Sequence, residues 1–278
     1  MASLAQRKFI SRIMTGLTAL CAVLVIVALF AILAYILIGG VRYLSLDFLV
    51  NDPKPVGEAH SGIRNAIVGS AILVAVGSVI GIPIGVLGGL FLAETEAHKL
   101  ASIIRFLIDN LIGVPSIIIG VFAWTAIVKP TGHFSGWAGG LALAMMMAPI
   151  VARTTEEMIK LVPMELREAA LALGAPRWRV SLGVVLRTAA GGIGTGCMLA
   201  IARVAGETAP LLFTALGLGY LNTNLNQPMA SLTYQIYYYA TSPYEDWHAM
   251  AWSATLVLIT MIFMLNIAVK FILRSKHS

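Results

Sequence analysis

The chain has 278 residues, of which 59% are hydrophobic and only 12% are charged, and its mean hydropathy is +0.88. Soluble domains carry about 45–50% apolar and about 25% charged residues. The composition therefore excludes a water-soluble globular protein, and its high apolar content excludes a disordered chain. Two cysteines in a chain of this length exclude a small disulfide scaffold. The class of protein that fits this composition is a membrane protein.

Six apolar stretches are long enough to cross a bilayer, because a helix needs about 20 mostly apolar residues to span a hydrocarbon core of about 30 Å. The first is too long for the apolar region of a signal peptide, which has about 7–15 residues, and is expected to be a retained helix. We expect one all-α membrane domain, residues 1–278, with spans at approximately 13–38, 66–93, 106–128, 136–152, 188–218 and 249–270.

Basic residues are distributed unequally between the connections of these spans. Fourteen Lys and Arg residues fall at the two termini and in the second-to-third and fourth-to-fifth connections, against four in the opposite segments. Cytoplasmic segments carry such an excess, so both termini are predicted to be cytoplasmic. The net charge of +6 then reflects topology, and no nucleic-acid partner is expected.

Two features of the apolar part indicate how the helices pack. Glycines recur every four residues in the second span, which predicts close approach to a neighbouring helix, with a hinge or pore lining as the alternative. The outer segment 219–248 lacks Lys and Arg but contains a tyrosine cluster. Because Tyr favours the headgroup level, this segment is expected to lie along the membrane surface, with a substrate gate as the alternative. The glycines are Gly77, Gly81, Gly85 and Gly89, and the tyrosines are Tyr234, Tyr237, Tyr238 and Tyr239.

The connection 153–187 contains a short helix with start and stop signals. Pro163 suits the first turn, and Gly174 followed by Pro176 suits the end. The helix is about 16 Å long and cannot span a membrane. One small apolar face suits a groove on another protein, although a helix lying on lipid is the alternative. This face is formed by Leu166, Ala169, Ala170 and Leu173.

The same connection resembles the EAA loop of ABC-importer permeases, E-A-A-x3-G-x9-I-x-L-P. Val184 stands at the isoleucine position and Arg187 at the terminal proline position. The resemblance implies a coupling helix that binds the ATPase subunit. The residues that match it are Glu168, Ala169, Ala170, Gly174 and Leu186.

The chain has no G-x-x-x-x-G-K-[ST] phosphate-binding loop. We therefore expect a transport subunit that is not an enzyme and binds no cofactor, with ATP and Mg²⁺ on a partner ATPase. The five histidines lack metal-ligand spacing, and no metal site or catalytic arrangement is predicted.

Arg203 and Glu207 interrupt the fifth apolar stretch four residues apart. On a continuous helix they would share a face and pair, and Pro210 would break or kink that helix. Charges inside a bilayer are costly and mark substrate paths. Because a guanidinium matches phosphate or carboxylate oxygens, the pair is predicted to lie in a translocation path for an anion. A structural pair that locks two helices is the alternative.

The segment from Arg203 to Leu212 resembles the PstA-type permeases of phosphate-specific ABC importers, and the resemblance covers essentially the whole chain. It implies a type I ABC-importer permease architecture in the bacterial cytoplasmic (inner) membrane, surrounded by lipid, with inorganic phosphate as cargo. The implied partners are a homologous PstC-type permease, a PstB-type ATPase dimer and a periplasmic phosphate-binding protein. Arg203 and Glu207 map onto the translocation path, and the EAA residues onto the coupling helix.

Two other transport functions remain as alternatives. A permease for sulfate, molybdate or phosphonate would share the coupling loop and an anionic cargo. A secondary transporter predicts inverted internal repeats, which the sequence does not show.

Overall fold

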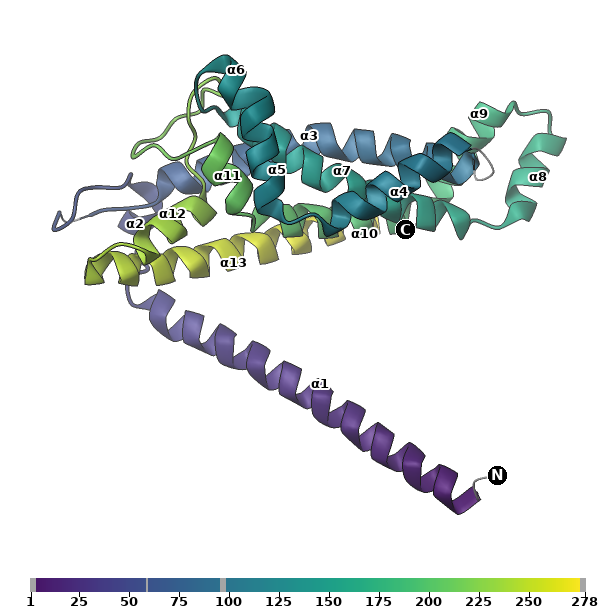
Figure 1. Ribbon diagram of the computed structural model, residues 1–278, viewed down its shortest axis with the longest axis horizontal. Coiled ribbons are helices and arrows are strands. Elements are labelled where there is room, and N and C mark those ends of the chain that lie inside the picture. Colours follow the sequence, from purple (N-terminus) through teal and green to yellow (C-terminus); the bar gives the residue numbers. More distant parts are fainter. Residues whose placement is uncertain (1–3, 59, 96–98, 276–278) are drawn as a thin grey trace.

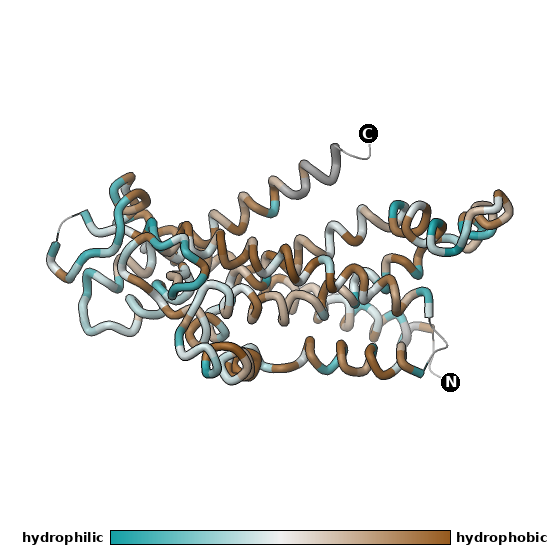
Figure 2. The backbone as a smooth tube through the Cα atoms, turned by 90° about the horizontal axis from the view of Figure 1, so that it is seen from above, coloured by the Kyte–Doolittle hydropathy of each residue, from teal (hydrophilic) through white to brown (hydrophobic). Residues whose placement is uncertain are grey.

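The chain is a bundle of helices in the computed structural model, which describes residues 4–58, 60–95 and 99–275; these residues contain no strand. Apolar helices run along the long axis, and hydrophilic residues gather in the loops at its ends (Figures 1 and 2). The expected all-α class is confirmed. The elements are α1 (Leu4–Val41), α2 (Leu46–Val50), α3 (Arg64–Glu94), α4 (Lys99–Gly113), α5 (Ser116–Ala123), η1 (Trp124–Val128), α6 (Lys129–Thr131), α7 (Gly136–Lys160), α8 (Met164–Ala172), α9 (Arg177–Val180), η2 (Ser181–Val185), α10 (Leu186–Ala205), α11 (Ala209–Thr214), α12 (Leu232–Ala240) and α13 (Glu245–Ser275).

Among the described residues, five helices are long and apolar enough to cross a membrane, and a bent helix pair brings the number to six if it counts as one span. That pair corrects the expected straight third span, 106–128. The helices α4 and Ser116–Thr131 meet at 106° across a break at Val114 and Pro115. Proline lacks an N–H and disfavours helical backbone in the residue before it, so the chain turns here.

The fifth expected span, 188–218, is also not one helix. The helix α10 ends at Ala205, and the short helix α11 begins at Ala209. Gly206 is a poor helix former, and Pro210 occupies the first turn of α11, where a missing N–H costs little. The break predicted at Pro210 therefore occurs a few residues earlier.

The tightest packing in the bundle joins α3 to α7 along the predicted glycine stripe, which is confirmed. All four glycines are buried, and α3 continues through Pro83. A Cβ added at Gly77 would lie 3.0 Å from the Leu143 Cβ, and one added at Gly85 would lie 2.6 Å from the Val151 Cβ. Only glycine permits the two backbones to approach this closely.

The central core cluster lies on this helix pair and includes Leu73 from α3, Leu143 and Met147 from α7, and Val204 and Leu211 from the broken fifth stretch. Two further clusters lie at the ends of the bundle. The end of the bundle that carries α12 and α2 is called the α12 end, and the end that carries α8 and α9 is called the α8 end (Figure 1).

The first helix, α1, diverges from the bundle (Figure 1). It packs on α13 near its own last turn, where the Ser253 hydroxyl donates a 2.7 Å hydrogen bond to the Gly40 carbonyl. The first turns of α1 and the last turns of α13 lie toward the α8 end (Figure 1). This agrees with termini on one side of a membrane, while the cytoplasmic assignment of that side stays a prediction.

Candidate translocation and coupling sites

The short helix α8 has the boundaries that the sequence predicts. Pro163 comes directly before the first residue of α8. Gly174 comes shortly after the last residue of the helix and has a φ of +80°, a conformation that glycine adopts without strain. The Gly174 N–H donates to the Leu171 carbonyl at 2.9 Å, and the Ala175 N–H donates to the Ala170 carbonyl at 3.3 Å. These two bonds close the helix C-terminus and give α8 a defined length.

The predicted small apolar face of α8 is largely uncovered. No residue of α8 is buried; Leu166 is 43% exposed, and Leu173, just after the helix, is 89% exposed. Glu168 and Ala169 are exposed and Ala170 is half-buried. The residues of the EAA pattern therefore lie together on an accessible helix projecting at the α8 end of the molecule (Figure 1).

The predicted pair of Arg203 and Glu207 on one helix face is wrong. Arg203 lies in the last turn of α10, whereas Glu207 follows the helix end. The Glu207 carbonyl accepts a 2.9 Å hydrogen bond from the Thr233 hydroxyl, and its N–H donates to the Val204 carbonyl at 3.1 Å. Neither charged side chain has an ion pair or hydrogen bond to another described residue. The break at Gly206 removes the helical spacing that pairing requires.

The two residues still lie at the same helix break, within the apolar part of the bundle. Val204 belongs to the same core cluster as Met147, which lies near the middle of α7. A Cβ added at Gly120 would be 2.9 Å from the Pro210 Cα, so α11 packs closely on α5. Arg203 is exposed and Glu207 half-buried on this fixed backbone. A charged side chain next to lipid is costly, so Arg203 is expected to face an aqueous cavity or a polar partner in the membrane.

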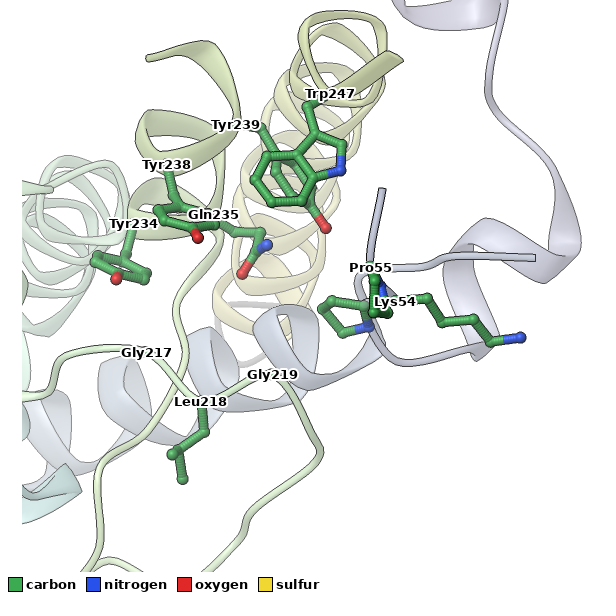
Figure 3. A pocket seen from close by; sticks show the side chains of 11 residues that line it. Lys54, Pro55, Gly217, Leu218, Gly219, Tyr234, Gln235, Tyr238, Tyr239 and Trp247 are labelled. Atoms are coloured by element: carbon green, nitrogen blue, oxygen red, sulfur yellow. The ribbon is translucent and has the colours of Figure 1, made fainter. Parts of the chain in front are cut away.

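The tyrosine segment forms a pocket at the α12 end instead of lying only along the surface. Tyr239 is 1% exposed, and Tyr237 and Tyr238 are about half exposed. Burial raises the pKa of the Tyr239 hydroxyl and of the Tyr234 hydroxyl, so both stay neutral. The pocket has a volume of about 390 Å³. The residues that line it (Figure 3) are Pro53, Lys54, Pro55, Gly217, Leu218, Gly219, Tyr234, Gln235, Tyr238, Tyr239 and Trp247.

One carboxylate ties the loops around this pocket together. The Asp52 side chain accepts hydrogen bonds from the Arg64 guanidinium, at 3.1 Å and 3.0 Å, and from the Leu221 N–H at 3.1 Å. Burial alone would raise the pKa of Asp52, but the bonds from Arg64 and Leu221 outweigh it and hold that pKa below its ordinary value. The loop after α2 and the loop after α11 are thereby fixed to the start of α3.

The sequence reasoning missed an ion network at the α8 end. Glu156 on α7 has a fully buried side chain, and its carboxylate accepts from the Arg105 Nε at 2.8 Å, the Lys160 Nζ at 2.7 Å and an Arg153 Nη at 3.3 Å. Arg105 also donates to the Leu92 carbonyl at 3.3 Å. The helices α3, α4 and α7 are joined here. The i, i+4 spacing of Glu156 and Lys160 was a sequence signal for their pairing on α7. No such spacing indicates Arg105, the partner on α4, which is 51 positions away from Glu156.

The histidines give no indication of a metal centre. Among the described residues no three His, Cys, Asp or Glu side chains are grouped to hold a metal ion. His60 pairs with Asp47 at 2.6 Å on the surface. His98 and His277 lie outside the described residues.

Comparison with known proteins identifies the family. Residues 81–277 match the model of the family described as binding-protein-dependent transport system inner membrane component. The phosphate transport system permease protein PstA of Haemophilus influenzae is 44% identical over 97% of this chain and 96% of its own length. PstA of Pasteurella multocida is 43% identical over 94% and 93% of the two chains. A probable PstA of Methanocaldococcus jannaschii is 36% identical over 78% and 77%.

Two solved structures share the fold at low sequence identity. A chain of a bacterial ABC transporter that imports the polysaccharide alginate has a TM-score of 0.69 at 12% identity, covering 98% of this chain and 99% of its own. A chain of the MetNI methionine ABC transporter has a TM-score of 0.65 at 20% identity, covering 77% and 96%. The expected type I ABC-importer permease fold is confirmed. The chain is a multi-pass inner membrane protein that belongs to the binding-protein-dependent transport system inner membrane component family, with PstA permeases among its relatives.

Proposed function

We propose that this chain is the permease subunit of an ATP-driven importer that carries inorganic phosphate across the cytoplasmic membrane. The observation that carries the proposal is the 43–44% identity, over most of the chain, to proteins named as phosphate transport system permeases. The fold of ABC-importer permeases and the accessible EAA-type helix support it. None of these observations points to a secondary transporter.

The phosphate path is proposed to pass Arg203. This guanidinium is exposed at a helix break within the apolar bundle, and no described acidic side chain neutralises it. A guanidinium offers a planar fork of donors to phosphate oxygens and stays charged at any physiological pH. Glu207, which is close in sequence but pairs with no other described residue, opposes tight retention of the anion. The two residues act on phosphate separately and not as an ion pair.

The helix α8 is proposed to be the coupling helix. Its uncovered face would seat in a groove of the ATPase, with Glu168, Ala169 and Ala170 in the interface and Gly174 fixing the helix end. The α8 end of the molecule, with both termini, would then face the cytoplasm, in agreement with the excess of basic residues there.

The remaining partners follow from the same proposal. A homologous PstC-type permease would complete the path, two PstB-type ATPase subunits would bind ATP and Mg²⁺, and a periplasmic phosphate-binding protein would deliver the ion at the α12 end. This chain itself would bind no cofactor and catalyse no reaction.

Two measurements test the proposal. First, the chain is purified in detergent from cells that express the whole transport system: an ATPase subunit is expected to co-purify, and to be lost with Gly174→Val. The helix variant Gly183→Ala is the control, because a Cβ at Gly183 meets no described residue within 4 Å and its φ is not positive. Second, the complex in proteoliposomes is expected to take up labelled phosphate, with no inhibition by a tenfold excess of sulfate or molybdate. Uptake of sulfate or molybdate in place of phosphate would reassign the cargo, and absence of an ATPase would refute the class.

A further inference from the structure

The helix α8 is joined to the transmembrane helices by one arginine. Arg167 donates from Nη1 to the Glu94 Oε1 at 2.7 Å, and from Nη2 to the Ile159 carbonyl at 3.2 Å. Glu94 is the last residue of α3, and Ile159 is the penultimate residue of α7. One planar guanidinium therefore contacts the ends of both helices, 73 and 8 positions away in the sequence.

The rest of α8 is held weakly. None of its residues is buried. Ala170 is the α8 residue that packs against the core cluster at the α8 end. Within the described residues the α8 side chains make no other hydrogen bond or ion pair with the long helices α3 and α7. Without Arg167, α8 would be tied to α7 by the Leu161–Pro163 connection and to α10 through α9 and η2.

The two helices that Arg167 contacts are packed directly against each other. The glycine stripe places the α3 backbone directly against α7, and this is the most extensive helix contact in the molecule. At the α8 end a second arginine, Arg105, bridges the same two helices through the Leu92 carbonyl and the buried Glu156. A displacement of Arg167 therefore acts on a rigid pair, because packed cores do not deform continuously.

We propose that Arg167 is a positioning residue that transmits movement of α8 to the packed pair of α3 and α7. The inference rests on the proposed function of α8 as the ATPase-coupling helix. When the ATPase subunits move α8, the guanidinium fork carries the ends of α3 and α7 with it. When the fork is absent, part of the movement is absorbed in the connections on either side of α8.

The contact suits this role better than a role in stability. The Arg167 side chain is 18% exposed and the Glu94 side chain 32% exposed. Partly exposed ion pairs contribute little to stability, since water solvates both charges when they separate. Two directional hydrogen bonds from one planar group nevertheless fix the orientation of α8, which a single ammonium could not do.

The test measures coupling in proteoliposomes that contain the assembled complex, as phosphate imported per ATP hydrolysed. Arg167→Gln and Glu94→Gln are each expected to lower this ratio between about twofold and thirtyfold, the range over which residues between coupled sites modulate coupling. ATPase co-purification and basal ATP hydrolysis are expected to stay unchanged. Arg177→Gln, a loss of the same charge on neighbouring α9, is the matched control and should leave the ratio unaltered.

Charge exchange tests whether the ion pair between Glu94 and Arg167 itself carries the coupling. The double variant Glu94→Arg with Arg167→Glu restores the ion pair but not the bond to the Ile159 carbonyl, so its ratio is expected to lie above that of Arg167→Glu alone. The inference is overturned by a wild-type ratio in Arg167→Gln, or by a double variant no better than Arg167→Glu. If no ATPase subunit co-purifies with the wild-type chain, the proposed function is refuted, and this inference, which rests on it, is refuted as well.

Discussion

The Glu156 carboxylate and the Arg105 guanidinium, 51 positions apart, meet at 2.8 Å where α4 crosses the ends of α3 and α7. The carboxylate is fully buried, whereas its three cationic partners keep between 24% and 40% of their side-chain surface in contact with solvent. A buried carboxylate is tolerated only with such compensation, because removing a charge from water is costly. The arrangement gives α4 a fixed position at the end of a helix pair that otherwise packs through glycine.

Glu156→Gln is expected to destabilise the chain by about 1–3 kcal/mol. Breaking a buried pair typically costs 3–5 kcal/mol, and the value is lower here because the orphaned cations retain access to water. Thermal unfolding of the detergent-solubilised complex measures the loss. Glu157→Gln on the same helix is the control: its side chain is 54% exposed, and its pair with Arg153 is expected to contribute less than about 0.5 kcal/mol. Equal midpoints for the two variants would show that the buried network is not structurally important.

Gly85→Ala is expected to lower stability by about 1–3 kcal/mol through overpacking. A Cβ at this position would lie 2.6 Å from the Val151 Cβ and 2.8 Å from the Ala148 carbonyl oxygen. Neither neighbour can move away easily, because both belong to the α7 segment in the contact. The amount of folded protein recovered from membranes and its thermal midpoint report the effect.

Gly88→Ala is the matched control for this substitution. It lies three residues away on the same helix, and its added Cβ would meet only the Ala152 Cβ, at 3.8 Å. This is an ordinary contact, so the variant is expected to match the wild type or to gain slightly in helix propensity. A Gly85→Ala protein as stable as Gly88→Ala would contradict the packing argument.

The features that the sequence predicted correctly depend on local or periodic signals. Charge-free stretches located the long helices, the four-residue glycine period located the contact between α3 and α7, and proline and glycine located both ends of α8. Each signal reflects a property of a single element: an apolar helix that a bilayer can solvate, a helix face that lacks Cβ atoms, or a residue with a positive φ.

What the sequence could not predict depends on contacts between elements or on small differences at helix ends. The pairing of Arg203 with Glu207 assumed an unbroken helix, but α10 ends at Ala205, two residues before Glu207. The bend of 106° at Val114 and Pro115 turned a stretch whose composition alone looked like a straight span. Arg167 and Glu94 are 73 positions apart, and no pattern within either segment indicates the other.

The Asp52 link at the α12 end is expected to hold throughout the neutral range and to fail in acid. Its pKa in the folded chain lies below its ordinary value, so the stabilisation is complete above the unfolded pKa of about 3.9 and is lost as the pH falls through the lower folded value. Asp52→Asn removes the charge at all pH values. Faster hydrogen exchange of the Leu221 N–H at pH 7 is expected in this variant, because that donor loses its charged acceptor.

Asp47→Asn is the control for the Asp52 variant. Asp47 pairs with His60 on the surface, and both side chains are more than half exposed. Its replacement is expected to leave exchange at Leu221 unchanged. Equal exchange rates in the Asp52→Asn and wild-type chains would show that the loop is held by other contacts.

Arg203→Gln is expected to abolish phosphate uptake by the reconstituted complex while ATPase co-purification stays intact. The guanidinium lies at a helix break and makes no hydrogen bond or ion pair with another described residue, so its loss is expected to act mainly on the anion. Glutamine keeps a hydrogen-bond donor on a shorter side chain but loses the charge and the bidentate fork. Initial rates of labelled phosphate uptake at saturating binding protein measure the effect, and uptake at the wild-type rate would exclude Arg203 from the path.

The double variant Arg203→Glu with Glu207→Arg distinguishes a phosphate contact from a structural ion pair. If the two side chains stabilised one another, exchanging their charges would restore uptake, as is expected for Glu94 and Arg167. The structure shows Glu207 beyond the helix end. Its backbone carbonyl accepts a hydrogen bond from Thr233, and its carboxylate pairs with no side chain in the described part of the chain. We therefore expect no recovery, because the cation must occupy the position at the end of α10 where the anion meets it. Recovery of half the wild-type rate or more would restore the ion-pair interpretation.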